Sequence, residues 1–462
     1  MQRTMQKAAQ KTAHSINIFK VVYLSLILTT LSGSVIAKTD IYEKMAQQMQ
    51  SYQNQYNKNN SHYQQQYNQG LQEYRDTYRR HLSDYKSRVE QQWGVAETST
   101  PSKLVLYTPQ MTEKLVVDYQ QNRVIVSKQN QSTANTEDLE SLLVDALSMP
   151  ISQLSTRFEV EPGMALPRAE AEAGKGVSTL AESLAISPVD IAPLAKQIIG
   201  NQDAQGEVDA VERTIKVLSD HAQQIQQSGK NLDADSSRKE LQYANQLKLE
   251  RQRAEKYRKH IEQASVKAKS TSYRGSVNPS RWQRSQAYRQ YVAQQSKANA
   301  VPESLIYAVM ETESDFNPLA VSPVFALGLM QVVPTTAGID VNQYLYNDPT
   351  PPAKSTLFQP PQNVLFGTTY IKLLYFSYFT KIDDPTSRLY CTIAAYNTGM
   401  GNVAKVFNGD SMSVNKAAKK INGMTSEQVY QQLLRNLPAQ ETRDYLVKVL
   451  AAMRYYDNEL AS

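Results

Sequence analysis

The sequence predicts an α+β protein that is mostly helical, and three observations indicate this fold class. Residues 41–89 carry an eleven-residue repeat, which is typical of one long helix. Short β-prone runs are confined to 103–128, in KLVLY and EKLVVDYQQNRVIVSK. Helical patterns dominate from residue 137 to the end of the chain. We therefore expect a long helix, then a mixed α/β N-terminal domain, then a helical C-terminal domain.

The composition allows two or three domains and gives no reason to expect nucleic acid as a partner. The chain has 462 residues, of which 41% are hydrophobic, and its mean hydropathy is −0.52. Its formal charge of +6 comes mainly from residues 1–37, which contain no acidic residue. The remainder has 46 basic and 44 acidic residues, which is close to balance.

Residues 1–37 have the pattern of an export signal. A basic segment runs to Lys20 and is followed by VVYLSLILTTLSGSVIA, which is short and polar for a transmembrane helix. We expect cleavage after Ala37 and a periplasmic protein, free or associated with the membrane or wall. An uncleaved membrane anchor is the alternative. The single cysteine, Cys391, does not follow the apolar run as a lipoprotein signal requires, and we expect it to be a buried small hydrophobe.

Residues 38–95 contain the long helix with the tyrosine repeat. An eleven-residue period corresponds to 3.67 residues per turn, so the repeated side chains form a nearly straight stripe. The stripe either packs on its own protein or on a second copy, or it stacks on sugar or peptide of the cell wall. The partner that we expect for this helix is therefore a second copy or another protein. The repeated residues are Tyr52, Tyr63, Tyr74 and Tyr85, then Tyr56, Tyr67, Tyr78 and Val89, with Leu71 and Leu82 at a third position.

The middle of the chain, residues 96–275, is expected to hold the mixed domain followed by a charged helix. After the β-prone runs, helices are predicted near 137–149, 177–199 and 207–228. The stretch 236–268 is rich in charge and predicts a solvated helix. Residues 270–280, STSYRGSVNPS, suggest a boundary, so that the last domain is 276–462.

The residue types available in the C-terminal domain favour carboxylate chemistry. All five histidines precede it, at positions 14, 62, 81, 221 and 260. Histidine-assisted nucleophiles and histidine-rich metal sites are therefore excluded within this domain, and no cysteine cluster or phosphate-binding loop replaces them. We expect neither a metal nor another cofactor.

Two glutamates lie close together in AVMETESDFNP. The preceding residues Leu305, Ile306 and Val309 recur at helical spacing, and this places Glu313 on the apolar stripe of a helix. Glu311 is rotated about 160° from it and is expected to face solvent. A carboxyl group on an apolar face has a raised pKa and can donate a proton near neutral pH. The alternative is that Glu313 is a helix-end residue whose carboxyl reaches water.

Four segments occur in order in the last domain: ETESDFNPLAVS, ALGLMQVVPTTAG, AAYNTGMGNVAKVF and LPAQETRDYLVKV. This series resembles the soluble lytic transglycosylase (SLT) domain family, which is lysozyme-like and cleaves peptidoglycan. The resemblance implies a lysozyme-like catalytic domain over 276–462. More weakly, residues 93–127 resemble the N-terminal domain of a membrane-bound member of the family.

The resemblance also implies residue roles. Glu313 corresponds to the catalytic acid of the family's Glu-Ser pair. Ser322 and Met330 have simpler alternatives, as a turn residue and a core residue, and Tyr445 could serve core packing. The implied substrate-binding residues are Ser322, Met330, Gln331, Tyr396, Asn397 and Tyr445.

The activity implied by the resemblance is cleavage of the bond between N-acetylmuramic acid and N-acetylglucosamine, with formation of a 1,6-anhydro ring. Glu313 would act as the single acid and base, with peptidoglycan glycan strands as substrate. Two alternatives stay open at this point. One is a muramidase of the same fold, in which water attacks. The other is a wall-binding scaffold protein that has little activity.

Overall fold

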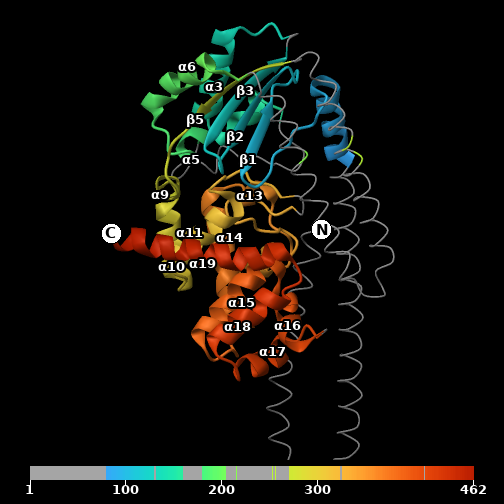
Figure 1. Ribbon diagram of the computed structural model, residues 1–462, viewed down its shortest axis with the longest axis vertical. Helices are drawn as coiled ribbons and strands as arrows, with labels where there is room; N and C mark the ends of the chain where they lie inside the picture. The colour runs from blue at the N-terminus through green and yellow to red at the C-terminus, as the bar shows by residue number, and fades with distance from the viewer. Residues whose placement is uncertain are drawn as a thin grey trace, which may run out of the picture. The chain divides into compact units, whose positions relative to one another are not determined.

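A computed structural model describes residues 80–129, 132–159, 179–203, 270–322, 325–409 and 411–462, with the single positions 215, 252 and 255 (Figure 1). The chain divides into two compact units, 1–76 and 77–462, and every described residue belongs to the second. The export signal and most of the tyrosine repeat therefore lie outside the described residues. So do the helices predicted at 207–228 and 236–268, apart from the three single positions, which are helical.

The first part of the described unit is a five-stranded antiparallel sheet. Its strand order is β1-β2-β3-β5-β4, so the last two strands are exchanged relative to the chain. The β-prone runs at 103–128 are confirmed as the first three strands. The bounds are β1 Lys103–Tyr107, β2 Glu113–Asp118, β3 Arg123–Gln129, β4 Gln202–Asp203 and β5 Ser270–Ser276.

Alternation along the strands gives the sheet two apolar faces. On β2, Val116 points to one face while Leu115 and Val117 point to the other. Helices α3, α5 and α6 cover the face of Leu115, and Figure 1 shows α3 and α6 against the sheet. The bounds of these elements and of the two short 3-10 helices are α3 Thr136–Ser148, η1 Ile151–Thr156, α5 Leu180–Ser183, η2 Pro188–Asp190 and α6 Ile191–Gly200.

A helix over residues 80–93 covers the other face of the sheet. Its side chains Tyr85 and Val89, both from the eleven-residue repeat, are buried there beside Trp93. At its C-terminal end, the tyrosine stripe thus packs on its own protein. The remainder of the stripe lies outside the described residues, so its partner stays a prediction.

Strand β5 occupies the segment in which the sequence suggested a domain boundary. Its residues, STSYRGS, form no apolar run, yet the strand pairs with β3 from Arg123↔Ser276 to Gln129↔Ser270. Gly275 permits the close packing of α6 on this strand, because a Cβ atom there would lie 2.4 Å from a side-chain carbon of Ile198. The sheet therefore continues directly into the helical domain.

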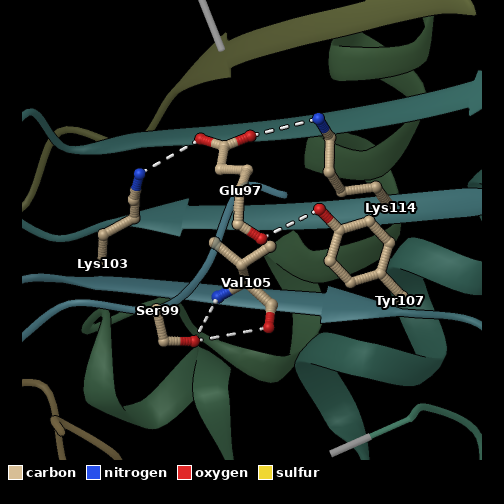
Figure 2. Close-up of polar contacts among 6 residues, drawn as sticks. All are labelled: Glu97, Ser99, Lys103, Val105, Tyr107 and Lys114. Atoms are coloured by element: carbon tan, nitrogen blue, oxygen red, sulfur yellow. Dashed lines mark hydrogen bonds and ion pairs between the residues drawn. The ribbon is translucent and has the colours of Figure 1, made fainter. Parts of the chain in front are cut away.

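A buried charge cluster joins the segment after helix 80–93 to the sheet (Figure 2). The Glu97 carboxylate lies 3.1 Å from both Lys103 Nζ and Lys114 Nζ, and the Tyr107 hydroxyl donates to the Glu97 carbonyl at 2.9 Å. The two lysine side chains are only 7% and 3% exposed. Lys114 also lies over the Trp93 ring, at 4.5 Å from its centroid. Removal of one partner from such a buried ion pair destabilises the fold, because it leaves an uncompensated charge in the interior.

From Arg281 onward, the described residues form helices joined by loops. Helix α11 packs along α19, and α15 packs against α19 as well. Cys391 on α15 is fully buried, as predicted. Within the described residues, no helix combines the length and apolar character that a membrane crossing needs. The bounds are α9 Arg281–Gln286, α10 Arg289–Asn299, α11 Glu303–Ser314, α12 Ala337–Tyr346, α13 Lys354–Leu357, α14 Pro360–Lys372, the π-helix η4 Leu373–Tyr378, α15 Pro385–Thr398, α16 Met400–Asn408, α17 Val414–Ile421, α18 Ser426–Asn436 and α19 Gln440–Ala461.

Replacing Glu97 with Gln is expected to lower the free energy of unfolding by about 3–5 kcal/mol, because two buried lysines lose their counter-ion. The measurement is urea denaturation followed by circular dichroism. Asp145→Asn is the matched control, since Asp145 pairs with Arg157 at the surface, where both side chains are more than 40% exposed. The control substitution should lower the free energy of unfolding by less than about 1 kcal/mol. Equal losses of unfolding free energy in the two variants would contradict the role of Glu97 as counter-ion of the two buried lysines.

Candidate active site

Helix α11 carries the two glutamates, and its C-terminal end is fixed on two sides. The residues from Ser304 to Met310 are all buried, so the helix runs through the core of the domain. It ends because Asp315 and Phe316 both take left-handed backbone conformations, with φ of 51° and 66°. The Ser314 hydroxyl lies 2.8 Å from the carbonyl oxygen of Leu329, which ties the helix end to the loop that contains Gln331.

Glu313 is half-buried at this helix end, and burial raises the pKa of its carboxyl from 4.5 to about 8. The nearby Tyr445 hydroxyl opposes the shift, because it favours the carboxylate form, while the charge of Glu441 adds to it. The negative end of the helix dipole also disfavours a carboxylate at this position. The raised pKa favours the protonated form of Glu313 near neutral pH, in the direction expected for a carboxyl group on the apolar side of the helix.

Glu311 does not face solvent, which corrects the expectation from the helical pattern. Its side chain is 18% exposed and is held by Arg281 Nη1 at 3.0 Å and by the Tyr456 hydroxyl at 2.6 Å. The side of α11 opposite Glu313 is covered by α9 and by the C-terminal part of α19, which the pattern of one helix does not reveal. The two glutamates thus differ in environment, one with a cationic partner and the other beside an acidic residue.

Tyr396 and Tyr445 lie beside Glu313, each on a different helix. Burial raises the pKa of both phenols, and the neighbouring Glu313 carboxyl raises it further when it is ionised. The Tyr396 hydroxyl donates to the carbonyl of Met330 at 2.8 Å, and this bond joins α15 to the loop of Gln331. Among the described residues, the buried Tyr445 hydroxyl has no hydrogen-bond partner of good geometry. It is available to a ligand or to the acid.

A buried asparagine fixes the loop that contains Gln331 through hydrogen bonds. Asn363 on α14 accepts from the Met330 amide at 2.7 Å and donates to the carbonyls of Leu327 and Leu357 at 2.8 and 2.6 Å. The sequence analysis did not single out Asn363. A polar residue within the otherwise apolar segment QNVLFG could have indicated it. Gln331 itself has a left-handed backbone, with φ of 46°.

The side chain of Gln331 keeps one polar atom free of protein partners. Its Nε2 donates to the carbonyls of Ala320 and Gly328 at 3.2 and 2.9 Å. Its buried Oε1 has no partner within the described part of the chain. A buried acceptor without a partner costs free energy, so it marks a position where a ligand can donate a hydrogen bond.

Three other predicted residues are placed by contacts within the protein. Ser322 Oγ accepts from the Ala326 amide at 3.0 Å and closes a turn. The Met330 side chain is fully buried, and Gly367 leaves the space for it, since a Cβ there would lie 2.4 Å from the Met330 sulfur. Met330 therefore contributes to this site through its backbone carbonyl. Asn397 accepts from the Thr442 hydroxyl at 2.8 Å, which joins α15 to α19.

Glu441 is a second carboxyl group near Glu313, and the sequence analysis missed it. It lies in the first turn of α19, one helical turn before Tyr445, and burial raises its pKa. In the sequence, Glu441 is the first residue of the segment ETRDY, and its position in this segment could have indicated it. Burial also raises the pKa of Asp315 to about 6, and the charges that act on it are those of Arg284, Glu311, Asp118 and Lys448. The described residues contain no group of three or more His, Cys, Asp or Glu arranged for a metal ion.

The loop after α11 also contacts the N-terminal sheet region. Asn317 Nδ2 donates to the carbonyl of Pro101 at 2.9 Å, just before β1. Within the helical domain, the Tyr288 hydroxyl donates to the Phe316 carbonyl at 3.0 Å. Arg284 bonds to Asn122 in the turn between β2 and β3. The left-handed turn that follows Glu313 is thus supported by both parts of the described unit.

Comparison with known proteins places this site in a known class of domain. Residues 290–419 match the family described as Transglycosylase SLT domain, a range that includes Glu313, Gln331, Tyr396 and Asn397. Tyr445 lies beyond the matched range. The resemblance predicted from the four motifs is thereby confirmed for the C-terminal domain.

Among individual proteins, the chain is similar to membrane-bound lytic murein transglycosylase C of Shigella sonnei (strain Ss046), with 47% identity over 173 residues. That match covers 37% of this chain and 47% of the relative, so the chain spans less than half of the relative's length. An inactive mutant of lytic transglycosylase Slt from Pseudomonas aeruginosa gives 21% identity and a TM-score of 0.29, covering 55% of this chain and 36% of the other. The 70-kDa soluble lytic transglycosylase in complex with bulgecin A gives 18% identity and a TM-score of 0.30, covering 71% and 43%.

Replacing Glu313 with Gln is expected to stabilise the protein at neutral and higher pH. The folded protein holds the Glu313 proton more tightly than the unfolded chain, so wild-type stability falls as the pH rises from 4.5 towards 8. The variant has no carboxyl group at this position, so its stability does not fall in this way. Its free energy of unfolding should exceed that of the wild type by on the order of 2 kcal/mol at pH 8, with no difference near pH 4.5. Denaturant unfolding at several pH values measures the difference.

Glu311→Gln is the control on the same helix. It removes a carboxylate that Arg281 and Tyr456 hold, so it should destabilise the protein rather than stabilise it. A Glu313→Gln difference that stays constant between pH 4.5 and 8 would show that the Glu313 pKa is not raised.

Proposed function

We propose that this chain is a lytic transglycosylase that cleaves the bond between N-acetylmuramic acid and N-acetylglucosamine in peptidoglycan, on the periplasmic side of the envelope. The observation that carries the proposal is the raised pKa of Glu313, which lies within the range matched by the SLT domain, beside Tyr396 and Tyr445. The next residue, Ser314, bonds to the loop that contains Gln331. The murein activity named for the similar Shigella protein supports the same substrate class.

In the first step, the Glu313 carboxyl donates its proton to the glycosidic oxygen, and the bond from that oxygen to C1 of the muramic acid breaks. The 2-acetamido carbonyl of the same sugar stabilises the developing positive charge at C1. A pKa of about 8 keeps Glu313 in the acid form until the proton is needed. The free Oε1 of Gln331 provides an acceptor for a sugar N–H or O–H group.

In the second step, the Glu313 carboxylate takes the proton of the C6 hydroxyl while O6 bonds to C1. The 1,6-anhydro ring closes, the acid is restored, and no water is consumed. Tyr445 favours the carboxylate form of Glu313 and so supports the state between the two steps. One carboxyl group serves as acid and then as base.

A muramidase remains the second candidate function, and Glu441 is the observation that favours it. Hydrolysis by two carboxyl groups needs a second acid near the first, and Glu441 acts electrostatically on Glu313. The products distinguish the two reactions, because water attack leaves a reducing end and ring closure does not.

Digestion of purified peptidoglycan, with products identified by mass spectrometry, tests the proposal. The wild type and Glu311→Gln should release anhydro-muropeptides, whereas Glu313→Gln should lose at least about a thousandfold in rate. Reducing-end products would make the protein a muramidase. Absence of any product from the wild type would favour the wall-binding scaffold.

The pH dependence of kcat/KM tests the role of Glu313 independently. The reactive form carries the proton, so the rate should fall about tenfold per pH unit above pH about 8. Steady-state release of soluble fragments from pH 5 to 10 measures the profile. A rate that already falls above pH 5 would mean that Glu313 is ionised at neutral pH and is not the acid.

The proposed reaction assigns no step to the tyrosine repeat. Its described end packs against the sheet, and residues 38–79 lie outside the described part of the chain. The proposal for this segment is self-association or binding of another protein through the remainder of the stripe.

A further inference from the structure

We propose that Asn317 and Arg284 are positioning residues, through which the N-terminal sheet fixes the end of α11 that carries Glu313. Neither belongs to the substrate-binding residues considered above, and each bonds to a turn beside a strand of the sheet. Because Glu313 is the acid of the proposed reaction, the inference rests on that function for its catalytic consequence. Its structural part, the control of Glu313 by the sheet, is testable without the reaction.

The turn after α11 has an unfavourable backbone conformation. Asp315 and Phe316 have φ of 51° and 66°, and positive φ is uncommon for residues other than glycine. It is especially unfavourable for a bulky residue such as Phe316. Such conformations persist only where the surrounding structure imposes them. The turn therefore needs support, and Glu313 lies only two residues before it.

Part of this support comes from the helical domain. The Asn317 amide donates to the Ser314 carbonyl at 3.0 Å, and Asn317 Oδ1 accepts from the Leu319 amide at 3.0 Å. Tyr288 stacks on the Phe316 ring, with centroids 6.2 Å apart and an angle of 13° between the planes. The Tyr288 hydroxyl also donates to the Phe316 carbonyl at 3.0 Å. These contacts fix the backbone after Phe316 and the orientation of its ring.

The first contact with the sheet is a hydrogen bond from Asn317, which is fully buried. Its Nδ2 atom donates to the Pro101 carbonyl at 2.9 Å. Pro101 lies in a tight turn that is closed by two backbone bonds between Thr100 and Lys103, of 2.8 and 3.2 Å. Lys103 is the first residue of β1 and pairs with Asp118 on β2. The acceptor of the Asn317 bond is therefore held by the sheet.

The second contact with the sheet is made by Arg284 on α9. Its Nη1 atom donates to Asn122 Oδ1, in the turn between β2 and β3, and the Asn122 carbonyl accepts from the Val277 amide at 2.8 Å. Arg284 is only 4% exposed, and its Nε atom has no hydrogen-bond partner among the described residues. Loss of the Asn122 oxygen would leave this buried cation with one acceptor fewer. Tyr288, which supports Phe316, follows Arg284 by four residues.

These two contacts give the sheet an influence on the acid. Without them, we expect the left-handed turn to relax and the last turn of α11 to move with it. The Glu313 carboxyl would then become more exposed to water, and its pKa would fall towards the ordinary value of 4.5. The sheet therefore supports catalysis by keeping the acid in one position and in one environment.

The test replaces Asn122 with Gly in the full chain. Asn122 has φ of 50°, which glycine adopts readily, so the variant keeps the turn and its backbone bonds and loses the acceptor of Arg284. The infrared band of the Glu313 carboxylic acid is isolated by subtracting the spectrum of the same protein with Glu313→Gln. We expect the midpoint of its titration to fall by about 0.5–1 pH unit in Asn122→Gly.

Asn317→Ala tests the other contact and should have a larger effect. It removes the donor to Pro101 and also the acceptor of the Leu319 amide. The midpoint should fall further than in Asn122→Gly. A misplaced acid slows the chemical step more than it weakens substrate binding, so kcat should fall about tenfold while KM stays within about twofold.

Asn135→Ala is the matched control, because Asn135 is an exposed asparagine at the start of α3, which covers the sheet. Its side chain caps α3 by accepting from the Asp138 amide at 2.9 Å. Loss of this cap should lower the stability of the protein. The Glu313 midpoint and kcat/KM should stay at their wild-type values, because this cap makes no bond to the helical domain.

An Asn122→Gly midpoint equal to that of the wild type would overturn the inference. A fall of the same size in Asn135→Ala would overturn it as well, because the midpoint would then follow stability rather than the contact with α9. The lytic reaction is scored separately by its products. A midpoint that depends on Asn122, in a protein that releases no anhydro products, would support positioning by the sheet and remove the proposed reaction. Anhydro products together with a midpoint indifferent to Asn122 would leave the reaction and remove the inference.

Discussion

The helical domain is arranged around one half-buried carboxyl group that has no cationic partner among the described residues. Glu313 lies at the negative end of α11, beside the acidic Glu441, and its pKa rises to about 8. Two residues earlier, Glu311 is held by Arg281 and Tyr456, as a structural glutamate normally is. Of these two glutamates, only Glu313 has a raised pKa and a cost to stability at neutral pH, which is typical of a catalytic group.

Several neighbouring elements fix the helix end and the loop that surround this carboxyl. Helix α19 packs along α11 and brings Tyr445, while α15 brings Tyr396, whose hydroxyl reaches the loop of Gln331. Asn363 fixes the same loop from α14. The N-terminal sheet takes part as well, because its Pro101 carbonyl accepts from the loop that ends α11. A protonated acid is useful only if its position is fixed.

Sequence patterns predicted the structural features that depend on residues close together in the chain. The period of α11 placed Glu313 on the apolar side, and the runs at 103–128 predicted three strands. The patterns failed where distant segments meet. Strand β5 was missed because its polar residues gain their partners only from β3, and Glu311 was assigned to solvent because α9 and α19 cover it. The effect of Glu441 on the acid likewise depends on how α19 packs against α11.

Direct titration of the Glu313 carboxyl tests whether this group holds its proton at neutral pH. Infrared difference spectra between the wild type and Glu313→Gln isolate the carboxylic acid C=O band of this one residue. We predict that the band is present at pH 7 and disappears with a midpoint near pH 8. A midpoint near the ordinary glutamate value of 4.5 would contradict the account.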